Sequence, residues 1–182
     1  MQLTKDQSQE VKITAIESLK SPKVPSDAKL KCLSEASSTN EWREKESIVK
    51  LLPELSMDSN EYNPIIIQML QDDACAVRKA VISKLSTLAA RSNSTLKTDI
   101  RPALREMFES NDYQLRQASI LAIIKLGLFD EDGMNILENA TKDYVSNVRY
   151  VLAENIPKGP KFQPIINILK SDKDEDVRSL FN

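Results

Sequence analysis

The chain has 182 residues, of which 41% are hydrophobic and 29% charged, and its 25 Lys and Arg against 27 Asp and Glu give a net charge of −2. It contains no histidine, three glycines and two cysteines. These counts exclude His-based nucleophile pairs, His-ligated metals, Gly-rich phosphate loops, zinc knuckles and disulfide frameworks. The charge is also too acidic overall for a general nucleic-acid binder. We therefore expect no enzyme, no catalytic residue, no cofactor, no metal and no nucleic-acid partner.

The N-terminal sequence MQLTKDQSQE lacks the cationic and apolar regions of a signal peptide. The longest apolar stretches, such as residues 65–67 and 121–124, are far shorter than the ~20 residues that a membrane helix needs. The two thiols are too far apart in sequence to suggest a disulfide framework and fit a reducing compartment. These features predict a cytoplasmic protein, with the nucleus as a second location, and no membrane partner.

The chain repeats one short phrase, which ends in an arginine. In chain order, an apolar residue and then the arginine close this phrase five times, and an earlier copy ends in Lys12. The five arginines are Arg43, Arg78, Arg116, Arg149 and Arg178. Six residues before them stand Ser37, Asp72, Ser110, Asp143 and Asp172. Because several independent columns align in this way, the chain is predicted to be a repeat protein.

Each repeat is predicted to contain two helices joined by a tight turn. Pro64, Pro102 and Pro164 lie 14 residues before an arginine, and proline at the first helical turn loses no hydrogen bond. The Ser, Asp and Asn residues that follow favour a turn and the capping of a second helix. The expected helices are residues 5–20, 27–36, 40–56, 63–71, 74–91, 99–110, 112–127, 131–141, 145–156, 163–170 and 174–182.

The predicted fold is all-α, an α-solenoid or superhelix of about five helical hairpins. We expect a single domain over residues 1–182. Its units are predicted at about residues 1–20 (partial), 26–56, 63–91, 99–127, 131–156 and 163–182 (truncated).

Two-helix units with a proline at the start and Asp…Val-Arg between the helices resemble HEAT repeats over essentially the whole chain. Within that family, the chain looks most similar to the scaffold (A) subunit of the type 2A serine/threonine protein phosphatases. Three segments carry this resemblance: Asn40-Glu-Trp-Arg43 with Leu52-Pro53-Glu-Leu55, Asp143-Tyr-Val-Ser-Asn-Val-Arg149 with Ala153-Glu154, and the ending at 170–178. The resemblance implies a non-catalytic scaffold whose partners are a phosphatase catalytic subunit and a regulatory subunit.

Two other functions are compatible with such repeats. The chain could be part of another HEAT protein, such as a nuclear-transport carrier or a vesicle-coat adaptor. It could also be a HEAT-like DNA glycosylase, although a glycosylase needs aromatic and acidic residues in a basic groove, and here the aromatics are scattered.

The repeated arginines have two interpretations. In the structural one, each arginine bonds an acidic turn residue of its own or the neighbouring unit, namely Asp72, Asp143 or Asp172. In the functional one, the arginines form a comb for phosphates or an acidic partner. We favour the structural interpretation, since side chains at this place look structural in HEAT-like repeats.

The turns supply the candidate partner-binding residues, which are Trp42, Asp73, Tyr113, Tyr144 and Asn147. Trp42 could pack between units as a core residue, or it could lie exposed at the turns as a contact, since Trp is enriched in binding hot spots. The phosphatase-scaffold resemblance favours the second interpretation, because that family contacts its partners along the turns.

Overall fold

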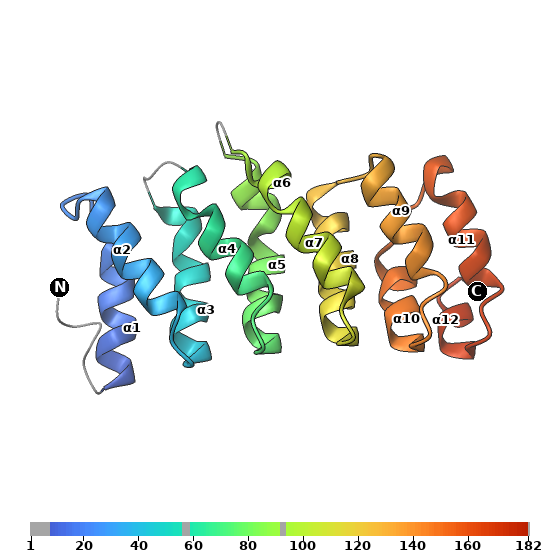
Figure 1. Ribbon diagram of the computed structural model, residues 1–182, viewed down its shortest axis with the longest axis horizontal. Helices are drawn as coiled ribbons and strands as arrows, with labels where there is room; N and C mark the ends of the chain where they lie inside the picture. The colour runs from blue at the N-terminus through green and yellow to red at the C-terminus, as the bar shows by residue number, and fades with distance from the viewer. Residues whose placement is uncertain (1–7, 56–58, 92–93, 182) are drawn as a thin grey trace. The chain divides into compact units, whose positions relative to one another are not determined.

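The computed structural model describes residues 8–55, 59–91 and 94–181, which form helices and turns with no strand among them (Figure 1). The chain divides into two compact units, unit 1 (Met1–Ile100) and unit 2 (Arg101–Asn182). Each unit consists of consecutive helical hairpins, so the architecture within each unit is a stack of short antiparallel helix pairs.

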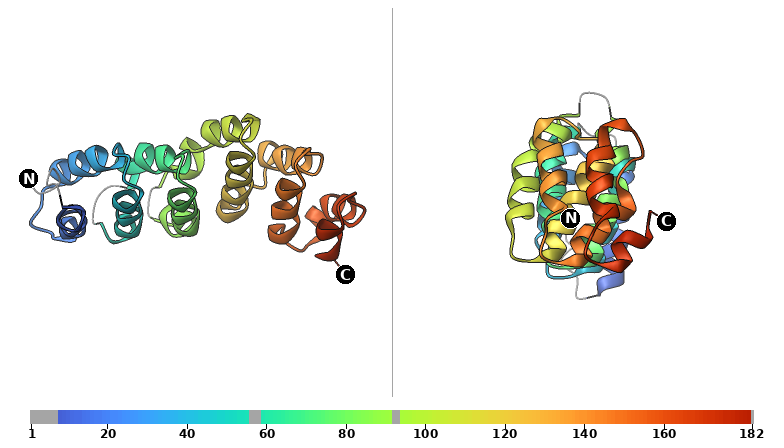
Figure 2. Two further views of the ribbon diagram at one scale, coloured as in Figure 1. Left: turned by 90° about the horizontal axis from the view of Figure 1, so that it is seen from below. Right: turned by 90° about the vertical axis from the view of Figure 1, so that its right-hand side faces the viewer.

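Unit 1 places its helices in two rows, one of α1, α3 and α5 and the other of α2 and α4 (Figure 2). Helix α3 packs against α1 and α5 in its own row and against α2 in the other. The helices of unit 1 are α1 (Gln9–Glu17), α2 (Ser26–Ser37), α3 (Trp42–Leu51), α4 (Asn63–Leu70), α5 (Cys75–Ala89) and α6 (Leu96–Asp99). Its 3-10 turns are η2 (Ser18–Lys20), η3 (Leu52–Glu54) and η4 (Ser59–Tyr62).

Unit 2 has the same organisation, with α8 packed against α7, α9 and α10, and α10 packed against α9, α11 and α12. Its helices are α7 (Arg101–Glu109), α8 (Tyr113–Leu126), α9 (Glu131–Ala140), α10 (Ser146–Asn155), α11 (Gln163–Lys170) and α12 (Glu175–Ser179), with η5 (Pro160–Phe162) before α11.

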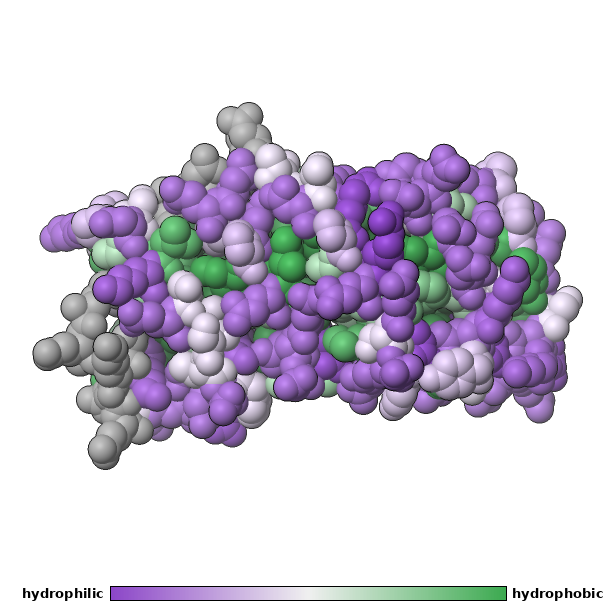
Figure 3. Space-filling view, viewed as in Figure 1, coloured by the Kyte–Doolittle hydropathy of each residue, from purple (hydrophilic) through white to green (hydrophobic). Residues whose placement is uncertain are grey.

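The first helices of the hairpins bury one apolar face. In α4 the residues Ile65, Ile66, Met69 and Leu70 are at most 5% exposed, which is the i, i+1, i+4, i+5 pattern of a single helical face. Burial of each such side chain contributes roughly 1.5–3 kcal/mol relative to leaving it in water. Polar side chains cover most of the visible surface, and the apolar ones gather in the furrows between helices (Figure 3). The hairpins therefore cohere through apolar contacts between adjacent helices.

The predicted helices are found, with differences at several boundaries. The α-helices α1 and α3 end at Glu17 and Leu51, and each is followed by a 3-10 turn where a continuous helix to 20 and to 56 was expected. Helix α1 begins at Gln9, and the expected start at residue 5 lies outside the described residues. The helix expected over 99–110 is α7, which begins at Arg101, and a short helix that was not expected, α6, precedes it; Pro102 has no N–H to continue the hydrogen bonds of α6 into α7. Helix α12 ends at Ser179, whereas a helix to residue 182 was expected; residue 182 is outside the described part.

Candidate functional site: the turns and their ladder of charged side chains

Three aspartates organise the turns that lead into the second helices. One carboxylate oxygen of each accepts a hydrogen bond from the backbone N–H two residues further on: Asp72 Oδ1 from Ala74 (2.9 Å), Asp143 Oδ1 from Val145 (2.9 Å) and Asp172 Oδ1 from Asp174 (2.8 Å). This Asx-turn geometry is a local preference of aspartate. Each aspartate therefore fixes the direction in which the following helix begins.

An arginine at the fourth position of the following helix closes the same turn. Its Nη1 donates to the carbonyl oxygen six residues earlier, in Arg78 to Asp72 (2.5 Å), Arg149 to Asp143 (2.7 Å) and Arg178 to Asp172 (2.6 Å). Arg116 makes the equivalent bond to Ser110 (2.9 Å). The constant spacing of six residues seen in the sequence thus corresponds to one arginine-to-carbonyl contact.

In unit 2 the same guanidinium groups also reach the next turn. Arg116 donates Nε and Nη2 to the two carboxylate oxygens of Asp143 at 2.7 and 2.9 Å, and Arg149 binds Asp172 with the same pair of distances. The four side chains are only 3–6% exposed. We call the series of contacts from the cation at the fourth position of a second helix to a carboxylate of the next hairpin the ladder; in unit 2 these contacts are forked. It ties consecutive hairpins together through buried ion pairs, in the geometry that arginine forms best with carboxylates.

The ladder changes the proton affinity of its members. The hydrogen bonds that Arg116 donates to Asp143 raise the pKa of Arg116, and those that Arg149 donates to Asp172 raise the pKa of Arg149. Burial by itself disfavours the charged form of Asp172, but the hydrogen bonds from Arg149 and the Asp174 N–H outweigh it and lower the pKa of this carboxyl below its ordinary 3.8. Asp172 is therefore held as a carboxylate in the folded chain.

The lowered pKa of Asp172 predicts a loss of stability in acid. The unfolded chain binds a proton at Asp172 at higher pH than the folded chain does, so stability falls as pH falls. This contribution is complete above about pH 5 and disappears as pH falls below 3.8 through the folded pKa. Urea unfolding between pH 7 and pH 3 measures it, and Asp172→Asn should show a shallower decline.

Asp130 provides the contrast for this experiment. The hydrogen bond from Arg101 also lowers the pKa of Asp130, but its side chain is 50% exposed, so solvent screens the pair. Asp130→Asn should change the acid dependence less than Asp172→Asn does. Equal slopes for the wild type and Asp172→Asn would contradict the acid prediction.

In unit 1 the ladder uses different residues from those predicted. Arg43, expected in the ladder, is exposed, and its guanidinium lies 5.2 Å from the Trp42 ring centroid and donates to Gln9 (3.4 Å). The fourth position of α3 is Lys45, and its Nζ binds Asp72 Oδ2. Lys12, at the fourth position of α1, pairs with Glu44 at 3.3 Å. The prediction for Arg43 was wrong because this second residue of α3 is exposed and its guanidinium binds Gln9 rather than a carboxylate or carbonyl of the turn.

The corrected assignment agrees better with the sequence. The residues three and four positions after Lys45 are Ile48 and Val49, as Val81 and Ile82 are after Arg78, whereas those after Arg43 are polar. Lys45 also lies 33 residues from both Lys12 and Arg78. The apolar pattern could therefore have identified Lys45 as the ladder residue of α3. It was missed because only arginines were aligned.

This correction predicts different outcomes for two neighbouring cations. Lys45→Ala should lower the free energy of unfolding by about 1–3 kcal/mol, since it removes a charged hydrogen bond at 11–13% side-chain exposure. Arg43→Ala should change it by no more than about 0.5 kcal/mol, as is usual for surface substitutions. Chemical denaturation of both variants measures the difference. A larger loss in Arg43→Ala than in Lys45→Ala would restore Arg43 to the ladder.

The five candidate partner-binding residues are all exposed: Asp73 and Tyr144 lie in turns, and Trp42, Tyr113 and Asn147 lie in the first turn of the helix that follows a turn. Trp42, Tyr113 and Tyr144 are 42%, 37% and 73% exposed, so the core interpretation of Trp42 does not hold. Trp42 and Asp73 belong to unit 1; Tyr113, Tyr144 and Asn147 belong to unit 2. The Tyr144 ring lies 4.7 Å from the Arg116 guanidinium carbon, within cation–π range. The backbone carbonyl of Asn147 accepts a hydrogen bond from Gln117 (2.9 Å), which links the beginnings of α8 and α10.

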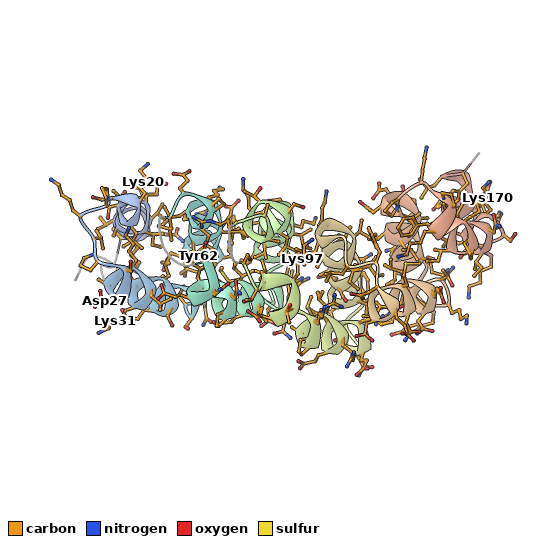
Figure 4. The ribbon with its side chains drawn as sticks, turned by 90° about the horizontal axis from the view of Figure 1, so that it is seen from above. Lys20, Asp27, Lys31, Tyr62, Lys97 and Lys170 are labelled. Atoms are coloured by element: carbon orange, nitrogen blue, oxygen red, sulfur yellow. The ribbon has the colours of Figure 1, made fainter. Side chains whose placement is uncertain are left out.

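One polar cluster of unit 1 has no counterpart in the predictions. Arg91, just after α5, donates to the carbonyls of Leu52 (3.1 Å) and Leu55 and to the hydroxyl of Tyr62, and its guanidinium lies 5.8 Å from the Tyr62 ring centroid. Tyr62 is 1% exposed and enters between the two rows of helices (Figure 4). Both residues fall in loops without a repeated column, so the sequence carried no signal for their contact.

The chemistry that these turns offer is recognition. The charged groups of the ladder are bonded to backbone carbonyls and to one another in buried ion pairs. Aromatic rings, in contrast, are exposed to solvent. Among the described residues, no group of three or more Cys, Asp or Glu side chains is placed to hold a metal ion. None of the described helices is both long and apolar enough to span a bilayer.

The fold and the ladder define the chain as an all-α helical-repeat protein. Residues 63–157, just over half of the chain, match the family described as HEAT repeats. The chain therefore belongs to the HEAT-repeat family, and the predicted all-α solenoid of helical hairpins is confirmed.

A solved structure gives the same fold. The crystal structure of an engineered protein is similar to this chain with a TM-score of 0.51 at 13% sequence identity, over 98% of this chain and 92% of the engineered one. No curated protein sequence gives a significant match to the chain. HEAT-repeat solenoids are typically non-catalytic and generally mediate protein interactions, as expected for chains that present extended surfaces.

Proposed function

We propose that the protein is a scaffold that binds other proteins through the turns before its second helices. One observation carries the proposal: three of the five large hydrophobic side chains exposed among the described residues are the turn aromatics Trp42, Tyr113 and Tyr144. Exposed aromatics at defined positions are typical of binding hot spots. One of the three contacts the ladder, since the Arg116 guanidinium lies over the Tyr144 ring and also donates to Asp143.

The turns are also suited to binding without rearrangement. In unit 2 the turns are anchored by buried forked ion pairs, so they lose little conformational freedom when a partner docks, and this lowers the cost of association. The proposed contact residues are Trp42 and Asp73 in unit 1 and Tyr113, Tyr144 and Asn147 in unit 2.

For the identity of the partner, we propose the catalytic subunit of a type 2A serine/threonine phosphatase, together with a regulatory subunit. Support comes from the sequence resemblance to that scaffold at 40–55, 143–154 and 170–178, and from the exposure of Trp42 beside Arg43 in the first of these segments.

Surface plasmon resonance with the full chain and a purified type 2A catalytic subunit tests this proposal. Binding is expected, and Trp42→Ala and Tyr144→Ala should each weaken it by roughly 30-fold, the effect of losing about 2 kcal/mol at a hot spot. Ile168→Ala is the matched control, because Ile168 is also exposed (47%) but lies in α11 rather than at a turn.

Two outcomes would contradict different parts of the proposal. Absence of binding by a chain with intact circular dichroism would rule out the phosphatase partner. If protein partners captured and identified from a lysate bind Trp42→Ala and Tyr144→Ala as well as the wild type, the turns are not the contact surface.

A further inference from the structure

Arg116 shows how this chain binds a guanidinium group at a turn. Tyr144 directly follows the ladder residue Asp143, whose Oδ1 also accepts a hydrogen bond from the Val145 N–H (2.9 Å). Arg116 donates to both carboxylate oxygens of Asp143, and its Cζ lies 4.7 Å from the centroid of the Tyr144 ring. One guanidinium thus binds an aspartate and the tyrosine beside it at the same time, through a forked ion pair and a cation–π contact.

The preceding turn of unit 2 carries a second aspartate–tyrosine pair, Asp112 and Tyr113. Asp112 is the N-cap of α8, and its Oδ1 accepts a hydrogen bond from the Gln114 N–H (2.8 Å). Asp143 makes the same bond to the second residue after it. Asp112 is exposed and Tyr113 is 37% exposed. The cap therefore orients an exposed carboxylate directly beside an exposed aromatic ring.

Asp112 differs from Asp143 in its bonding to cations. Among the described residues of the chain, Asp112 takes part in no ion pair. The arginine of the same helix, Arg116, is not available to it, because Nε, Nη1 and Nη2 of Arg116 donate to Asp143 and to two backbone carbonyls. Asp112 and Tyr113 thus offer to a partner the two kinds of group that bind Arg116 at the next turn.

The charge of the unit 2 turns favours a basic partner. Arg116 and Arg149 are at most 5% exposed and bond to oxygens of the chain itself, so they offer little to an acidic partner. The Tyr144 ring is 73% exposed, and a further cation beside it meets no net positive charge, because Asp143 neutralises Arg116. Outside the ladder, the charged residues at 110–113, 141–147 and 171–176 are mostly acidic: Asp112, Asp174, Glu175 and Asp176 against Lys142 and Lys173.

We propose that the turns of unit 2 bind a basic, arginine-bearing segment of a partner protein, with one arginine at Asp112 and Tyr113. Its guanidinium forms an ion pair with Asp112 and packs on the ring of Tyr113, as Arg116 does with its own pair at the next turn. The exposed Tyr144 ring and the carboxylates at 174–176 receive further basic side chains of the same segment. The inference rests on the scaffold function proposed above, because it uses the same turns, and it adds the charge of the partner.

An NMR titration of the isotope-labelled full chain with synthetic peptides tests the inference. The probe is an end-blocked peptide of about nine residues, in which arginine alternates with serine and which spans roughly 30 Å when extended. We expect the amide signals of Tyr113, Gln114 and Val145 to shift and saturate. Binding should weaken as salt rises from about 50 to about 300 mM, because exposed charges are screened.

Two matched peptides test the chemistry of the bound side chain. Citrulline has the shape of arginine without its charge, so a peptide with citrulline in place of each arginine should bind at least about tenfold more weakly. A peptide with lysine in place of each arginine should bind about two- to threefold more weakly, since an ammonium group forms neither a forked pair nor a planar stack.

Variants of the chain locate the binding. Asp112→Asn should weaken the arginine peptide about two- to fivefold, the effect of losing one exposed ion pair, while asparagine keeps the helix cap. Tyr113→Ala should weaken it by a similar factor through the loss of the cation–π contact. Lys142→Glu should strengthen it. Glu131→Gln is the control, because Glu131 is also exposed in unit 2 but begins α9, away from these turns, and it should leave binding unchanged.

Three results would overturn the inference: equal binding of the arginine and citrulline peptides, equal binding of the arginine and lysine peptides, or equal effects of Asp112→Asn and Glu131→Gln. None of them contradicts the scaffold function if protein partners from a lysate still bind Tyr144→Ala more weakly than the wild type. If those partners bind Tyr144→Ala as well as the wild type, the scaffold function itself fails.

Discussion

Arg149→Ala is expected to lower the free energy of unfolding by about 3–5 kcal/mol, because it leaves a buried carboxylate without its partner. Arg149 and Asp172 are 3% and 5% exposed in their side chains and share two hydrogen bonds. The same substitution also frees the Asp143 carbonyl, which Arg149 binds at 2.7 Å. Urea unfolding monitored by circular dichroism measures the loss.

Two further variants distinguish the contribution of the ion pair to stability from that of side-chain packing. Arg105→Ala removes an ion pair that is 61% and 65% exposed, so it should cost no more than about 1 kcal/mol. Arg149→Met combined with Asp172→Asn should be less harmful than Arg149→Ala, since no uncompensated charge remains. If Arg149→Ala is as mild as Arg105→Ala, the ladder is not what holds these hairpins.

Tyr62→Ala is expected to cost about 3–5 kcal/mol, the usual loss when a large buried aromatic is truncated to alanine. Tyr62 is 1% exposed, so the truncation leaves a cavity next to the Arg91 guanidinium. Tyr62→Phe keeps the ring and removes only the hydroxyl that accepts from Arg91, which should cost about 0.5–1.5 kcal/mol.

Thermal and chemical denaturation of the two Tyr62 variants determine which part of the side chain stabilises unit 1. Arg91 keeps the Leu52 and Leu55 carbonyls as acceptors in Tyr62→Phe, which is why the smaller loss is expected. Equal losses in Tyr62→Phe and Tyr62→Ala would mean that the hydroxyl, rather than the ring, stabilises the loop.

The helices could be predicted because each has a local cause. Pro64, Pro102 and Pro164 each stand in the first turn of a helix, and the apolar periodicity marked the buried faces. The turn aspartates could also be located, because an Asx turn and an arginine six residues later both act within one repeat.

Contacts between segments that are distant in sequence could be predicted less well from the sequence. The acid that pairs with Lys12 is Glu44 within α3, because Thr39 occupies the turn position that aspartate holds before Arg78, Arg149 and Arg178, and Thr39 donates to Glu44 (3.4 Å). Likewise, the partners of Arg91 depend on where the loop after α3 passes, which no repeated column specifies. Such pairings depend on how neighbouring hairpins are placed and not on local preference.

The two-sided bonding of Asp143 and Arg149 has a consequence for how such a chain can grow. The segment from α9 to α10 receives Arg116 at Asp143 and extends Arg149 to Asp172, so it carries both a matching acceptor and a matching donor. In a tandem duplication of this segment, Asp143 of the second copy would be available to accept from Arg149 of the first copy. No compensating substitution would be needed. The charge pattern is thus compatible with gain or loss of whole hairpins, whereas an insertion between Asp143 and Arg149 is expected to disrupt the bond from Arg149 to the Asp143 carbonyl.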